Sequence, residues 1–224
     1  MTDYRKLYPT WGELAREQVR RRGLLYFVDV RQEIQSRLTA LSPRARAAYA
    51  LACAERLMRR YLQLPASQQN GFTLNWLPVL EIMWAGLAEQ RQDTLDQVQT
   101  ALDTFYASPY NHNDGPDGPQ EADEDAAAAS ISAAQCYVSG EVQSADQTTS
   151  RAIEAAFRIA DEELQLDPNT FVWDPNAEPM PLARETMHPA VQRELQLLLA
   201  EVTLLEQHEI TPQLLDQLKR LNQP

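Results

Sequence analysis

Hydrophobic residues recur at every third or fourth position along most of the chain, which is the spacing of an α-helix that buries one face. In the stretch 43–64 the recurring positions are Tyr49, Cys53, Leu57 and Tyr61. This stretch begins with Ser42 and Pro43, and a serine N-cap followed by proline at the first helical position is a typical helix start. The pattern therefore predicts one long helix over 43–64.

The same spacing predicts further helices over 11–22, 30–41, 75–87, 95–105, 189–205 and 212–221. Two alanine-rich helices are expected over 123–139, ended by Gly140, and over 146–166. The stretch 24–30, "LLYFVDV", fits a strand and a buried helix equally well. We therefore expect an all-α protein, with residues 1–224 forming a single globular domain of about eight helices.

Two stretches lack a helical period and predict irregular loops. Residues 167–187 contain four prolines. The loop at 108–122 belongs to the segment 111–129, "NHNDGPDGPQEADEDAAAA", which has six acidic residues and no basic one. Its Gly-Pro pairs favour turns, so we expect this loop to connect two helices.

Composition narrows the class of protein. Of 224 residues, 44% are hydrophobic and only 7 are glycine, which favours a globular helical protein. The two cysteines lack metal-ligand spacing and imply no disulfide framework, which fits a reducing cytosol. The beginning of the chain has no apolar signal segment, and the apolar runs are too short to span a bilayer. These features predict a cytoplasmic protein that does not enter a membrane.

Charge is distributed unevenly along the chain. Residues 1–62 carry 13 Lys and Arg against 6 Asp and Glu, whereas residues 63–224 carry 7 against 26. The second part therefore has a formal charge of −19, within a total of −12. Because so acidic a surface repels phosphate backbones, we do not expect a nucleic-acid partner.

The acidic segment has three possible interpretations. As an EF-hand loop it fails, because Gly115 and Pro116 fall at positions five and six, where the loop needs a ligand and then glycine. Its end is better interpreted as a helix start, where carboxylates stabilise unpaired N–H groups. Its charge also remains available to a basic partner. The residues predicted to bind that partner are Asp114, Asp117, Glu121, Asp123, Glu124 and Asp125.

Candidate chemistry is sparse. Glu185 and His188 have the Glu-x-x-His spacing of di-iron carboxylate proteins, but those sites need a second such pair and two further glutamates. Pro189 also biases His188 away from helical geometry, which favours a helix cap or loop contact. No nucleophile, phosphate-loop or zinc motif occurs. We therefore expect no enzyme activity, no catalytic or metal-ligating residues and no cofactor. An alternative site would combine Glu55, Glu81, Glu185 and His188 across helices.

Several segments resemble the helical YjaG-like family of bacterial proteins of unknown function. They are "ALSPRARAAYALACAERLMRRYLQL", "LPVLEIMWAGL", "DEDAAAASISAAQ" and "HPAVQREL", and together they extend over about residues 38–206. The resemblance implies an all-helical fold and brings no established active site. The acidic loop at 108–122 departs from the family's pattern, and residues 1–30 lie outside it.

As a small, acidic, helical protein, the chain also resembles the immunity proteins of bacterial polymorphic and contact-delivered toxin systems. That resemblance implies a cognate toxin, or another basic protein, as the partner. Our hypothesis is a protein that neutralises such a toxin by forming a tight complex through an acidic surface. The alternatives are a helical metal-binding or enzymatic protein and a scaffold protein whose partner is not a toxin. The oligomeric state is left open.

Overall fold

The computed structural model describes residues 4–89, 92–108, 121–164 and 181–221, and every regular element within these ranges is helical. The all-α prediction is confirmed. The α-helices are α1 (Tyr4–Arg21), α2 (Phe27–Ala40), α3 (Pro43–Tyr61), α4 (Gly71–Leu74), α5 (Leu77–Glu89), α6 (Gln92–Tyr106), α7 (Glu121–Ser139), α8 (Val142–Leu164), α9 (Pro181–Met187), α10 (Pro189–Gln207) and α11 (Pro212–Leu221).

Three alanine-rich helices, α3, α7 and α8, pack against one another at the centre of the molecule. Their facing positions hold small buried residues, among them Ala48, Ala52, Ala129, Ala133 and Ala156. Small side chains let helix backbones approach closely, so the alanine runs favour this three-helix contact as well as helix formation. The four residues spaced by four in α3 (Tyr49, Cys53, Leu57 and Tyr61) are all buried, as their period predicts.

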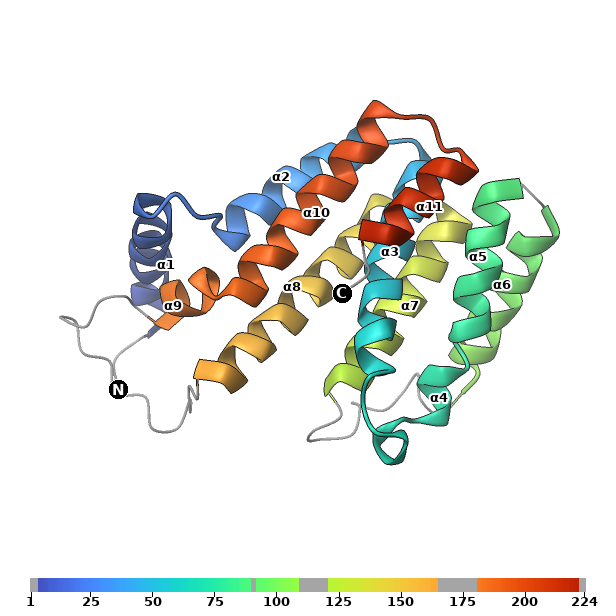
Figure 1. Cartoon of the computed structure of the whole chain (residues 1–224), viewed down its shortest axis with the longest axis horizontal. Helices are drawn as coiled ribbons and strands as arrows, with labels where there is room; N and C mark the ends of the chain where they lie inside the picture. Colours follow the sequence, from blue (N-terminus) through green and yellow to red (C-terminus); the bar gives the residue numbers. More distant parts are fainter. Residues whose placement is uncertain (1–3, 90–91, 109–120, 165–180, 222–224) are drawn as a thin grey trace.

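The remaining helices surround this centre. α10 packs along α2 and α8, and α5 and α6 form a hairpin against α7. Figure 1 shows α1 and α9 at one end of the molecule and the α5–α6 hairpin at the other. The main core draws on α2, α3, α5 to α8, α10 and α11, while a small second cluster joins α1, Tyr26 and α9. The single-domain organisation remains a prediction.

Helix ends follow the expected chemistry. The Ser42 hydroxyl accepts a hydrogen bond from the Ala45 N–H at 3.2 Å, and Thr211 accepts one from Leu214 at the same distance. Gly140 follows α7 with a φ of +70°, a conformation that favours glycine. His188 Nδ1 accepts a hydrogen bond from the Ala190 N–H at 3.3 Å, so His188 is the N-cap of α10.

The structure corrects the expected element list in two places. Residues 181–187 form the helix α9, although the proline-rich stretch 167–187 is predicted to be irregular; Pro181 stands at its first position, where proline is tolerated. The four-residue helix α4, capped by Asn70, is too short to show a period. With these two, the described residues contain eleven α-helices rather than about eight. The undecided stretch 24–30 leads into α2, without a strand.

None of the helices in the described ranges is both long enough and apolar enough to cross a membrane.

Candidate protein-binding site

The acidic residues predicted to bind a partner do not all lie on the surface. Asp123 and Asp125 are only 4% and 2% exposed, because the first turns of α7 are covered by neighbouring helices. Asp125 forms an ion pair with Arg158 of α8. Of the described side chains in this group, only Glu124 is partly exposed. The surface role predicted for Asp123 and Asp125 is therefore corrected to an internal structural one.

The structure does not describe the side chains of the other three predicted partner-binding residues. Asp114 and Asp117 fall in 109–120, and Glu121 begins α7, but the structure describes nothing of its side chain. Their role in partner binding stays a prediction. The interpretation of this segment as a helix start is confirmed, with α7 beginning at Glu121.

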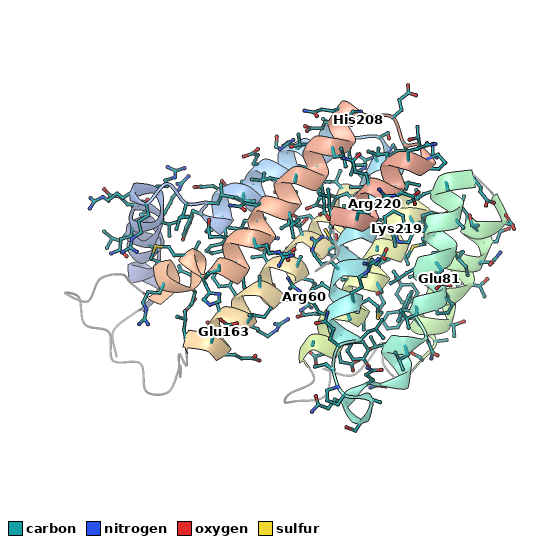
Figure 2. The ribbon with its side chains drawn as sticks, viewed as in Figure 1. Arg60, Glu81, Glu163, His208, Lys219 and Arg220 are labelled. Carbon is teal, nitrogen blue, oxygen red and sulfur yellow. The ribbon has the colours of Figure 1, made fainter. Side chains whose placement is uncertain are left out.

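The alternative metal or catalytic site is not assembled. Glu55 pairs with Arg59 on its own helix at 3.0 Å, as the i,i+4 spacing predicts. Glu81 is exposed on α5 and lies well apart from Glu163, whose carboxylate pairs with His188 Nε2 at 3.1 Å (Figure 2). Within the described ranges, no three His, Cys, Asp or Glu side chains are grouped so that they could hold one metal ion.

A buried ion cluster links α3 to α10, and sequence reasoning missed it. The guanidinium of Arg56 donates to Glu194 from Nε at 2.9 Å and to Glu201 from Nη1 at 2.5 Å. Both carboxylates are fully buried, and Arg56 is 4% exposed. Arg60 also donates to Glu194 at 3.0 Å. The formal charges of two arginines and two glutamates balance. The cluster therefore links α3 to α10 by ion pairs inside the core.

The cluster changes the titration of the groups around it. Burial by itself lowers the pKa of Arg56, but the charges of Glu194 and Glu201 outweigh it and hold the pKa well above its usual value. The thiol of Cys53 points at Glu201, with Sγ 3.8 Å from Oε2. Burial and, secondarily, that carboxylate raise the pKa of Cys53 far above its ordinary value. Cys53 is therefore an unreactive thiol.

The α5–α6 hairpin carries an acidic surface. Its exposed carboxylates are Glu81, Glu89, Asp93, Asp96 and Asp103, and within their described residues α5 and α6 contain no lysine or arginine. We call these five residues the acidic face. The sequence after α6 is also acidic: residues 77–125 hold eleven acidic residues and one basic residue, Arg91.

An apolar groove of about 500 Å³ lies between α4, α5 and α6. The residues that line it are Phe72, Asn75, Trp76, Val79, Ala101, Thr104, Phe105 and Ser108, and none of them is charged. Phe105 contacts Phe72 at a ring distance of 6.0 Å and Trp76 at 6.2 Å. The groove and the acidic face therefore share α5 and α6, so a single partner could contact both.

Comparison with protein families and with curated protein sequences finds no match. The fold is similar to the crystal structure of a DUF416 family protein from Shewanella baltica OS155, with a TM-score of 0.59. The likeness covers 84% of this chain and 92% of that chain at 15% sequence identity. At that identity it shows a shared helical fold. The finer assignments, to YjaG-like proteins or to immunity proteins, stay predictions.

Proposed function

We propose that this protein works by binding a basic protein and that its partner is a toxin, which the complex inactivates. The observation that carries the proposal is the acidic face, five exposed carboxylates on two helices that contain no cation. A toxin that acts on nucleic acid or nucleotides needs a positively charged cleft for its own substrate. An acidic protein surface is attracted to such a cleft and can cover it.

The place of the acidic face supports this proposal. The α5–α6 hairpin lies at one end of the molecule, away from α1 and α9, where Arg16 and Arg20 pair with Asp29 (Figure 1). The acidic face and these arginines therefore lie at opposite ends of the molecule, while a cation of α11, Lys219, lies over the Trp84 ring of α5 at 4.8 Å. A molecule charged in this way approaches a basic partner with its acidic end leading, which raises the association rate.

The proposal is tested by expressing the proteins encoded beside this chain, each alone and each together with it. We expect one of them to be basic, to arrest growth when expressed alone, and to be harmless when this chain is present. The purified pair should then form a stoichiometric complex that sediments as one species. If none of these proteins is toxic, or if the toxic one forms no complex with this chain, the proposal is wrong.

A further inference from the structure

We propose that the groove between α4, α5 and α6 binds the apolar face of a basic amphipathic helix. This inference rests on the proposed function, because it names the part of the partner that the acidic end of the molecule would hold. The groove has a volume of about 500 Å³, which lies within the range of about 300 to 1,000 Å³ for pockets that bury a ligand. It is therefore large enough to take apolar side chains from a partner.

The walls of the groove are built before any partner arrives. Phe72 stands on α4, whose first turn is capped by the Asn70 side chain at 2.9 Å from the Phe72 N–H. Tyr61 of α3 holds the same turn by donating to the Asn70 carbonyl at 3.1 Å. The opposite wall, Phe105, is in contact with Trp76, whose side chain is buried at 4% exposure. A preformed aromatic groove loses little conformational entropy on binding.

The lining of the groove and the surface around it favour different kinds of side chain on the bound partner. Inside, Phe72, Ala101 and Phe105 offer partly exposed apolar surface and no charge, so a charged side chain placed there would lose its hydration without gaining a partner. Outside, the acidic face on the same two helices favours cations. The occupant must therefore combine apolar anchors with flanking lysine or arginine residues.

Secondary structure decides in favour of a helix. The backbone groups of α5 and α6 are committed to their own helices, and the described residues contain no strand edge on which a peptide could pair. An apolar groove between helices binds a peptide by the helix-in-groove mode, in which side chains at i and i+4 are the anchors. A helix can carry its lysines on the remaining faces, which would then lie towards the acidic face.

The test uses a synthetic, dye-labelled 18-residue helix with leucine and tryptophan on one face and lysine on the others, and fluorescence anisotropy as the readout. A second peptide, with alanine in place of leucine and tryptophan, keeps the charge and removes the anchors. We expect the first peptide to bind at least tenfold more tightly than the second. Equal binding of the two peptides would overturn the groove inference while leaving attraction to the acidic face intact.

A matched pair of variants tests whether the peptide binds in the groove. Thr104 lines the groove, and Thr100 lies one turn away on α6 without lining it; both are exposed, and both donate to the carbonyl four residues earlier at 2.8 Å. Thr104→Arg and Thr100→Arg change the charge equally. We expect only Thr104→Arg to weaken the anchored peptide, by about tenfold. Equal effects of the two variants would show that the peptide does not bind in the groove. The proposal that the partner is a toxin would still be decided by the co-expression experiment.

Discussion

Arg56 is the residue on which the buried ion cluster depends. Its side chain is the only one that the described contacts join to both Glu194 and Glu201, and those two carboxylates have no exposed surface. A buried carboxylate without its cation retains the full cost of desolvation. Arg56 therefore joins α3 to both carboxylates of α10, and Arg60 adds a second link to Glu194.

We expect Arg56→Met to lower the free energy of unfolding by about 3 to 5 kcal/mol, measured by urea denaturation. Arg59→Met is the control on the same helix, and because its partner Glu55 lies on the same partly exposed turn it should cost less than about 1 kcal/mol. The double variant Arg56→Met with Glu201→Gln should recover part of the loss, because Glu194 keeps Arg60. A loss below about 1 kcal/mol in Arg56→Met would contradict this role.

Glu185 should make the free energy of unfolding depend on pH. Burial, helped by the nearby charge of Asp161, raises the pKa of Glu185 to about 6 from an ordinary value of 4.5. Because the folded state favours the protonated carboxyl, its contribution to stability is complete below about 4.5 and is lost as the pH rises through about 6.

Glu185→Gln should therefore remove part of the fall in unfolding free energy between pH 5 and pH 7. The difference should be at most about 1 kcal/mol, since solvent screens this partly exposed group. Denaturation at a series of pH values measures it. Glu162→Gln removes an exposed carboxylate from the same end of the molecule and should keep the wild-type profile. Identical profiles for both variants would show that Glu185 is not the responsible group.

At the scale of elements, glycine sets how closely the α5–α6 hairpin packs on α7. A Cβ atom at Gly86 of α5 would overlap the Tyr137 hydroxyl and the side chain of Thr94. Those two hydroxyl groups hydrogen-bond to each other at 2.7 Å and so join α6 to α7. The missing side chain at Gly86 is therefore what lets three helices meet at one point.

Gly86→Ala should force these helices apart and destabilise the protein by about 1 to 3 kcal/mol, as overpacked cores do. Gly71→Ala is the control, because a Cβ there meets no atom within 4 Å. That variant should be neutral or slightly stabilising. Thermal unfolding of both variants compares them directly, and an undisturbed Gly86→Ala would mean that the hairpin adjusts without cost.

At the scale of the whole molecule, the position of the acidic face should govern how the protein meets a partner. The acidic face lies at one end and the arginines of α1 at the other (Figure 1). Exposed charges act over about 10 Å at moderate salt, so the two ends are felt separately by an approaching protein. Association rate and its salt dependence, rather than affinity alone, report such an effect.

Reversing Asp96 and Asp103 to lysine should slow association with the partner at least tenfold at low salt and flatten the dependence on salt. The control reverses Glu13 and Glu17, exposed residues of α1 at the far end, and changes the net charge by the same amount. Stopped-flow mixing at several salt concentrations measures the rates. If both pairs slow association equally, only net charge matters and the acidic face has no special role.

Much of this fold follows from local rules that a sequence displays. The stripes of α3 and α10 are buried where their period places them, and Ser42, Gly140 and Thr211 mark helix ends by chemistry that acts within a few residues. Short elements escape such rules, which is why α4 and α9 are absent from the expected list.

The buried carboxylates, the ion cluster and the groove depend on contacts between residues distant in sequence, which local patterns do not predict. The acidic run at Asp123 and Asp125 looks like a surface, yet α7 is the central helix and its first turns are covered. The pairing of Arg56 with Glu194 joins residues 138 positions apart. One signal was available: Glu194 and Glu201 are seven residues apart, on the leucine face of α10. The groove likewise exists only because α4 is held beside α5 and α6.

The sequence by itself determined that the chain is helical, where most of its helices lie and how its charge divides, because period, capping and composition are local properties. The tertiary structure alone decided which carboxylates are internal and which form the acidic face, and it brought an aromatic groove to the same end. The physical reason is that burial and ion pairing are set by neighbours distant in sequence, and only packing chooses those neighbours.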